Sequence, residues 1–61
     1  MEKIEFQTLR KAIKGTDKIK IIDICNNCSI IYEGALNNAP AKNWEVLCIH
    51  IQENILILEV C

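Results

Sequence analysis

The chain has 61 residues, 51% of them hydrophobic, and a formal net charge of −1 from seven basic and eight acidic side chains. A chain of this length forms one small domain, here residues 1–61, and its apolar content excludes a disordered tail. The balanced charge argues against a protein that binds duplex nucleic acid, and the lack of an apolar run of about 18 residues argues against a membrane span.

The first pattern along the chain predicts an amphipathic helix over Glu5–Lys14. One helical face collects the apolar side chains that recur at spacings of three and four, namely Phe6, Leu9 and Ile13. Gly15 follows directly and suits the left-handed position at which many helices end. Residues 1–4 are expected to form either the first turn of this helix or a short extended lead-in.

A β-hairpin is predicted next, with the strands Lys18–Cys25 and Cys28–Glu33. Both strands are rich in β-branched residues and nearly alternate between apolar and polar side chains. Asn26-Asn27 separates them, and asparagine tolerates the positive φ that a two-residue type I′ turn requires. The alternation slips at Ile21-Ile22, which indicates either a β-bulge or a strand buried on both faces.

The stretch Ala35–Asn43 is predicted to be an irregular connector. It contains the one proline of the chain, and a helical turn is expected to begin near Pro40. Trp44 follows the connector and is expected to close the end of the core.

The second predicted hairpin pairs Val46–Gln52 with Ile55–Cys61 across the turn Glu53-Asn54. A two-residue turn fixes the register, with Gln52 opposite Ile55 and Ile49 opposite Leu58. One face is then wholly apolar and is expected to line the core: Leu47, Ile49, Ile51, Leu56, Leu58 and Val60. The outer face mixes apolar and polar side chains: Val46, Cys48, His50, Gln52, Ile55, Ile57, Glu59 and Cys61.

Together these elements predict an α+β fold, in which one N-terminal helix packs on a small antiparallel sheet of about four strands, built from two hairpins joined by a short connector. The semi-apolar outer face is either covered by the helix and the first hairpin or used for association with another chain. The last strand, Asn54–Cys61, lacks a lysine or proline that would protect a sheet edge. We therefore expect a homo-oligomer.

The four cysteines raise the question of a metal or redox site. Cys25 and Cys28 have the spacing of a zinc-ligand pair, and Cys48, His50 and Cys61 are the available further ligands. These further ligands do not form a second compact pair, so we expect no metal and no other cofactor. Cys25 and Cys28 flank a hairpin turn instead of opening a helix, which argues against a redox dithiol.

Catalysis is not expected. A nucleophilic set of Cys48, His50 and Glu59 can be drawn on the outer face. No glycine-rich turn or phosphate-binding motif accompanies it. The N-terminus also lacks the apolar block of a signal peptide, so we expect a cytoplasmic protein with reduced cysteines.

An aromatic ring beside cationic side chains can hold a nucleotide, and four residues are candidates for such a site: Tyr32, Trp44, Lys18 and Lys20. Core packing of both rings and solvation of both lysines is the competing interpretation, and residue types favour it. The outer-face residues that are candidates for an interface or ligand site are Cys48, His50, Ile55, Ile57 and Glu59.

Four runs of the sequence resemble small phage and prophage proteins of low-GC Gram-positive bacteria: DKIKIID (17–23), IIYEG (30–34), VxxI (46–49) and NxLxLEV (54–60), where x is any residue. In that group the first turn is typically Asx-Gly, where this chain has Cys-Asn-Asn-Cys (25–28). The resemblance implies that these cysteines decorate a turn that does not need them. It carries over no activity.

Small phage proteins often inhibit host systems, so the resemblance implies a role for the chain. We expect a non-enzymatic, oligomeric binding protein in the cytoplasm of a bacterial host. It would antagonise host defence by stoichiometric binding of a host protein or by sequestration of a nucleotide signal. The alternatives are a small zinc-binding module that uses Cys25 and Cys28, and a structural phage accessory protein.

Overall fold

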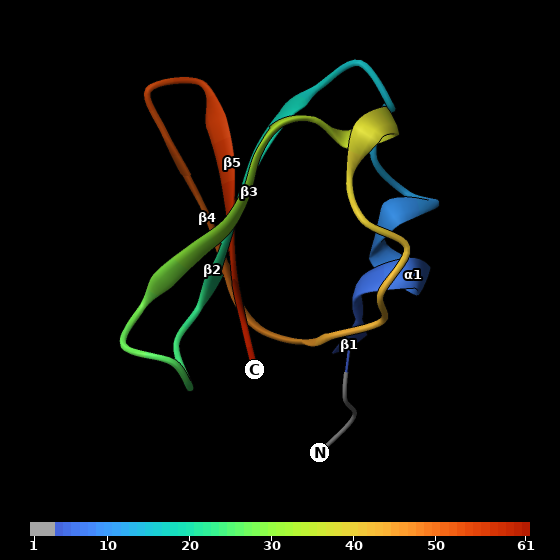
Figure 1. Cartoon of the computed structure of the whole chain (residues 1–61). Coiled ribbons are helices and arrows are strands. Elements are labelled where there is room, and N and C mark those ends of the chain that lie inside the picture. Colours follow the sequence, from blue (N-terminus) through green and yellow to red (C-terminus); the bar gives the residue numbers. More distant parts are fainter. Residues whose placement is uncertain (1–3) are drawn as a thin grey trace.

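A computed structural model describes residues 4–61, in which five strands form one sheet in the order β1-β4-β5-β2-β3 (Figure 1). One face of this sheet carries a covering layer made of a short helix, the loop that follows it (residues 11–17) and the segment before β4 (residues 36–44). The elements in chain order are β1 (Ile4–Glu5), α1 (Phe6–Arg10), β2 (Lys18–Asp23), β3 (Ser29–Ala35), the 3-10 turn η1 (Leu36–Asn38), β4 (Glu45–Gln52) and β5 (Ile55–Val60).

The predicted fold class, a helix on about four antiparallel strands, is wrong. The chain is mostly sheet, and the sheet is mixed, because β2 and β5 run parallel while the other neighbouring strands run antiparallel. β5 takes the central position because it is apolar on both faces: Ile57 and Leu58 point to opposite faces, and both are buried. Periodicity predicts the two strands of each hairpin, but it does not predict which strand of the first hairpin pairs with which strand of the second.

Both predicted hairpins form, and the register of the second is confirmed. Gln52 lies opposite Ile55 and Ile49 opposite Leu58. Glu53 and Asn54 both have positive φ, 52° and 66°, as a type I′ turn requires. The prediction that the last strand forms a sheet edge is wrong, because β5 lies between β4 and β2.

The first hairpin has a longer turn than the predicted Asn26-Asn27. β2 ends at Asp23 and β3 begins at Ser29, so Cys25 and Cys28 lie in the turn and not in the strands. An Asx-type contact shapes this turn, since the Asp23 carboxylate accepts a hydrogen bond of 3.0 Å from the Cys25 N–H. Positive φ occurs at Asn27 and Cys28.

The slip of alternation at Ile21-Ile22 is confirmed as a β-bulge. Ile21 pairs with Tyr32 and Ile22 pairs with Ile30, which leaves Ile31 as the extra residue of β3. The bulge keeps Ile21 fully buried while β3 bends.

The predicted helix over Glu5–Lys14 is too long at both ends. Ile4 and Glu5 are extended and pair with β4, so α1 begins at Phe6, and Ile4 belongs to an extended lead-in. Residues 1–3 of the expected lead-in lie outside the described residues. After Arg10 the backbone makes tighter bonds, such as Ala12 N–H to the Leu9 carbonyl at 2.9 Å, and the helix ends.

Gly15 does not end the helix but lies in the following loop, where it meets the connector. The Asn37 N–H donates to the Gly15 carbonyl at 2.9 Å, and the Asn37 side chain occupies the space where a Cβ of Gly15 would lie. The helix α1 therefore ends at Arg10, before the loop residue Gly15 contacts Asn37. Arg10 fixes α1 to the same connector, with guanidinium hydrogen bonds to the carbonyls of Asn37 and Pro40.

The connector contains a helical turn, but it precedes Pro40 instead of starting there: η1 is Leu36–Asn38. Trp44 closes the core as expected. Its indole is 8% exposed and meets the Phe6 ring edge-on, with centroids 5.3 Å apart. The covering layer is thus held by one aromatic pair and by the buried Leu36.

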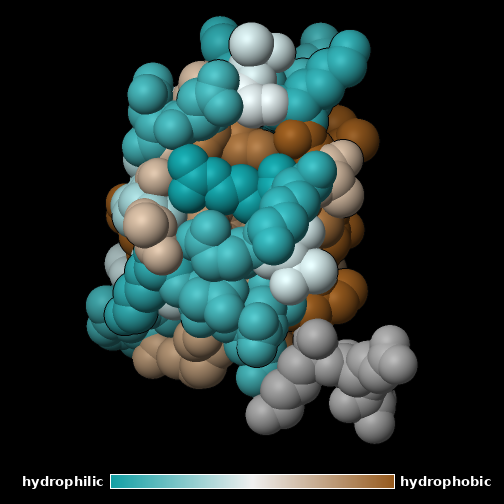
Figure 2. Space-filling view, turned by 90° about the vertical axis from the view of Figure 1, so that its right-hand side faces the viewer, coloured by the Kyte–Doolittle hydropathy of each residue, from teal (hydrophilic) through white to brown (hydrophobic). Residues whose placement is uncertain are grey.

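The predicted core face of the second hairpin is only partly covered. Leu58 and Val60 are buried and Leu56 is half-buried, but Leu47, Ile49 and Ile51 are exposed. The covering layer is too small to reach them: seen from its side, the surface is largely hydrophilic, and hydrophobic surface emerges along one flank (Figure 2).

Val46 was expected on the outer face, but it is buried in the core. The register of β4 slips between Val46 and Cys48, so that Val46 lies opposite Val60 on the covered face. The extra residue is Leu47. Among the residues that the structure describes, no helix is long and apolar enough to cross a membrane.

A disulfide bond joins Cys25 in the first turn to Cys61, with the two Cα atoms 5.3 Å apart. The Ile24 N–H donates to the Val60 carbonyl at 3.0 Å, which brings the turn against the end of β5. The sequence-based expectation of reduced cysteines did not include this pair. The bond closes a loop with a sequence separation of 36 and spans the parallel β2–β5 contact.

Reduction of this disulfide is expected to lower the free energy of unfolding by about 3 to 4 kcal/mol, because a loop of this length gains much chain entropy when it opens. Urea denaturation of the oxidised protein and of Cys61→Ser tests this. Cys28→Ser is the matched control, since Cys28 is exposed and free. Equal midpoints for Cys61→Ser and the oxidised protein would contradict the expectation.

Glu53→Asn is expected to raise the free energy of unfolding by about 0.5 to 1 kcal/mol, because asparagine adopts positive φ at lower energy than glutamate does. The urea midpoint at fixed protein concentration measures this gain. Gln52→Asn is the control: Gln52 lies in β4 directly before the turn, and no gain is expected there.

Candidate functional site

Three outer-face side chains meet on the second hairpin: Cys48 and His50 of β4, and Glu59 of β5. Residues two apart on a strand share a face, and Glu59 lies directly opposite Cys48 in the register. Their candidate ligand atoms all lie within 4.8 Å of one another. The His50 Nδ1 is 3.8 Å from a Glu59 carboxylate oxygen. The structure thus brings together three of the predicted site residues.

Glu59 controls the protonation of Cys48. A hydrogen bond from the thiol to the Glu59 carboxylate raises the pKa of Cys48, and partial desolvation and the negative charge of Glu59 act in the same direction. A raised pKa keeps the sulfur protonated near neutral pH, and the thiolate is the nucleophile. This environment is the opposite of one that activates a catalytic cysteine.

A second feature is the edge formed by β4. In the part of the chain that the structure describes, β1 pairs with β4 only at Glu45 and Val46, so residues 47–52 have no neighbour on that side. Three large apolar side chains of this segment are exposed on the face that carries the covering layer: Leu47 (49%), Ile49 (40%) and Ile51 (72%). No lysine or proline protects the edge.

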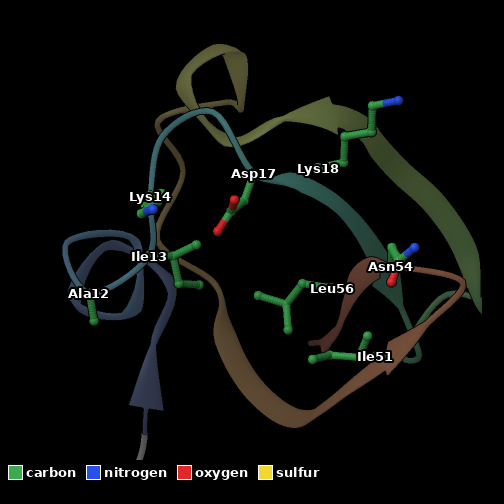
Figure 3. Close-up of a pocket in the computed structure, with 8 residues that line it drawn as sticks. All are labelled: Ala12, Ile13, Lys14, Asp17, Lys18, Ile51, Asn54 and Leu56. Atoms are coloured by element: carbon green, nitrogen blue, oxygen red, sulfur yellow. The ribbon is translucent and has the colours of Figure 1, made fainter.

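A pocket of about 570 Å³ lies between this edge and the covering layer. Its apolar floor is made by Ile13 from the covering layer and by Ile51 and Leu56 from the sheet, which point toward one another (Figure 3). The Asp17 carboxylate points into the same space, whereas the Lys18 ammonium extends away from it. The pocket is therefore a recess with an apolar floor and a polar rim beside the exposed strand.

The candidate nucleotide residues do not form one site. Trp44 is buried in the core, and the Tyr32 hydroxyl donates a 2.6 Å hydrogen bond to the Ala35 carbonyl while its ring packs on the core. Lys18 and Lys20 lie on β2, on the outer face. The rings therefore do not present a free face beside the lysines.

The other outer-face candidates, Ile55 and Ile57, lie on β5. Ile57 is buried although no helix or strand of residues 4–61 covers this face, because the register sets it between His50 and Lys20, whose side chains flank it. Ile55 is half-buried and lies at the start of β5. Neither residue is an exposed anchor for a partner.

The pair Cys25 and Cys28 does not form a ligand pair in the structure. Cys25 is bonded to Cys61, and Cys28 is exposed and free. The cysteine that does lie beside other potential ligands is Cys48.

Sequence reasoning missed the exposed Leu47, Ile49 and Ile51, which it assigned to the core. Their exposure could have been predicted from the sequence, because few apolar residues outside the strands are available to cover the eight-residue strand β4.

Comparison with known proteins finds no matching family model, no matching curated protein and no matching solved structure. The resemblance to phage proteins therefore stays a prediction.

Glu59→Gln is expected to lower the pKa of Cys48, because it removes a negative charge and an anionic hydrogen-bond acceptor. Cys48 would then react faster with iodoacetamide at mildly alkaline pH. Mass spectrometry of digested protein gives the rate at each cysteine. Cys28 is the internal control, since its rate should not change. An unchanged rate at Cys48 would show that Glu59 does not hold the thiol proton.

Proposed function

We propose that this protein is a non-catalytic binding protein that works as a homodimer, joined through the free edge of β4. The observation that carries the proposal is the strand segment 47–52, which no strand among residues 4–61 pairs with on its outer side, together with its exposed Leu47, Ile49 and Ile51. Exposed apolar surface on a small protein favours association, and an unpaired strand edge offers backbone groups to another strand.

The backbone geometry of the hairpin supports an edge pairing. In a two-residue hairpin the pair that flanks the turn exchanges both backbone hydrogen bonds, and such pairs recur at every second residue. Gln52, His50 and Cys48 therefore bond to β5. Ile49 and Ile51 direct their N–H and C=O groups away from β5, toward the open edge.

The edge is complementary to itself. Antiparallel pairing of two copies about Ile49 sets Ile49 opposite the partner's Ile49, and Leu47 opposite the partner's Ile51. The apolar side chains of both copies then form one continuous row on the covered face. Between Leu47 and Gln52 the only titratable side chains are Cys48 and His50, so no pair of like charges opposes the contact. Beyond this segment the same register places Glu45 opposite the partner's Glu53, so like charges limit the contact to residues 47–51.

The size of the molecule supports a partner of this kind. A standard interface buries about 800 Å² on each side, which is roughly a fifth of the 4304 Å² accessible surface of this chain. One strand edge does not provide that area alone. The exposed apolar side chains and the recess at Ile13, Ile51 and Leu56 continue the surface beside it.

Within this proposal the dimer acts by stoichiometric binding of a host protein, as the resemblance to phage proteins implies. Sequestration of a nucleotide has less support, because the Trp44 ring is buried and the Tyr32 ring packs on the core. The outer face of the sheet stays open when the β4 edges pair, so it remains available to a second protein.

Sedimentation equilibrium at micromolar concentration tests the dimer. The wild-type chain, 7.0 kDa, is expected at twice this mass. Ile51→Glu is expected to give monomers, because each dimer would bury two carboxylates in an apolar row. Ile30→Glu is the matched control: Ile30 is exposed on β3, away from the β4 edge, and its variant should remain dimeric.

Amide hydrogen exchange separates an edge pairing from other contacts. The N–H groups of Ile49 and Ile51 should be protected in the wild-type protein and should exchange rapidly in Ile51→Glu. A wild-type monomer would overturn the proposal. A dimer with unprotected Ile49 and Ile51 amides would also overturn it, because the contact would then lie elsewhere.

A further inference from the structure

We infer that Cys48, His50 and Glu59 form a binding site for a zinc ion on the outer face of the sheet. This site differs from the zinc pair that the sequence offers at Cys25 and Cys28. All three ligands come from one chain, so the inference does not require the proposed dimer.

The ligand types suit zinc. Zn²⁺ is bound in proteins by cysteine sulfur, histidine nitrogen and carboxylate oxygen, and sites with three protein ligands keep a fourth position open. A thiolate and a carboxylate also balance the two positive charges of the ion. Mg²⁺ and Ca²⁺ prefer oxygen ligands alone, so a sulfur and an imidazole argue against them.

The backbone holds the three side chains in a chelating arrangement. Cys48 and His50 project from one face of β4, and Glu59 projects from the paired strand directly opposite Cys48. The ligand atoms lie within 4.8 Å of one another. Ligand atoms of a tetrahedral zinc site are separated by roughly 3.3 to 3.8 Å, as its bond lengths require. The remaining contraction needs only side-chain rotation.

Such rotation is available because all three side chains reach solvent. His50 is 46% exposed at its side chain and Glu59 is 31% exposed. Cys48 is also exposed. An ion can therefore reach the site from solvent without opening the fold, and the sheet beneath the ligands does not have to move.

Zinc would reverse the effect of Glu59 on Cys48. Without metal, the carboxylate holds the thiol proton. A bound cation stabilises the thiolate and takes the carboxylate as a second ligand, so binding releases the thiol proton to solvent. Lys20 and Glu33 lie in the His50 row beyond Ile57, and Lys18 lies on the same face of β2. Affinity should therefore rise with pH.

The fourth position has a candidate occupant if the proposed dimer forms. Antiparallel pairing about Ile49 sets Cys48 opposite the partner's His50, whose imidazole is then available beside the ion. Otherwise a water molecule completes the coordination. Only this assignment of the fourth ligand rests on the proposed function. The monomeric Ile51→Glu variant distinguishes the partner's His50 from water as that ligand.

Cobalt titration tests the site, because Co²⁺ replaces zinc and reports its ligands. Protein with the disulfide intact is freed of metal by a chelator and titrated with Co²⁺. The wild-type chain is expected to bind one ion, with visible bands of a tetrahedral complex and a near-ultraviolet sulfur-to-cobalt charge-transfer band. Addition of Zn²⁺ should remove both sets of bands.

Substitution assigns the ligands. Cys48→Ser is expected to abolish the charge-transfer band, and His50→Ala and Glu59→Gln should each weaken Co²⁺ binding at least about tenfold. Cys28→Ser is the matched control and should bind as the wild type does, because Cys28 is the other free, exposed cysteine. Circular dichroism verifies that each variant keeps its fold.

Three outcomes would overturn the inference. The first is a wild-type chain without a charge-transfer band, and the second is a band that survives in Cys48→Ser. The third is an Ile51→Glu monomer that no longer binds Co²⁺, since a site within one chain must persist. If that monomer binds while the wild type proves to be a monomer as well, the zinc site stands and the dimer proposal falls.

Discussion

The parallel pairing of β2 with β5 is the contact on which the rest of the structure depends. It sets Ile19 beside Leu56 and Ile21 beside Leu58, and so joins two hairpins that would be marginal alone into one sheet with a shared core. The Cys25–Cys61 disulfide closes the same contact at one end. Because β5 becomes the central strand, β4 lies outside it, and among the described residues β1 pairs with β4 only at Glu45 and Val46.

The small size of the covering layer follows from the same arrangement. About half of the chain lies in the strands, and the sheet face is covered only by a five-residue helix, the loop after it, a 3-10 turn and a connector. The Phe6–Trp44 pair and Leu36 seal the core at β2, β5 and the start of β4. Ile49 and Ile51 lie on the same face of the sheet as the core, but the covering layer does not reach them, so their side chains are exposed to solvent. Association through that edge is one physical solution for a chain that cannot cover its own sheet.

The opposite face of the same hairpin has different chemistry. There the exposed Cys48 and His50 meet Glu59, and the carboxylate raises the pKa of the thiol. In the proposed zinc site the thiol exchanges its proton for the metal ion. The two features use alternate residues of one strand, the odd-numbered Ile49 and Ile51 on one face and the even-numbered Cys48 and His50 on the other. An interface and a metal site can therefore occupy β4 together.

The sequence by itself determined what depends on neighbours along the chain. It specified both hairpins, the Glu53-Asn54 turn with its register, the burial of Trp44, and the shared face of Cys48, His50 and Glu59, and it located the irregularity at Ile21-Ile22 without deciding its kind. Alternation and turn geometry act within a few residues, so these features can be inferred from the pattern. The tertiary structure alone decided the central place of β5, the short α1, the Cys25–Cys61 bond and the exposure of Ile49 and Ile51. These depend on which apolar faces the whole chain can bury at once, a competition between distant segments that local periodicity does not resolve.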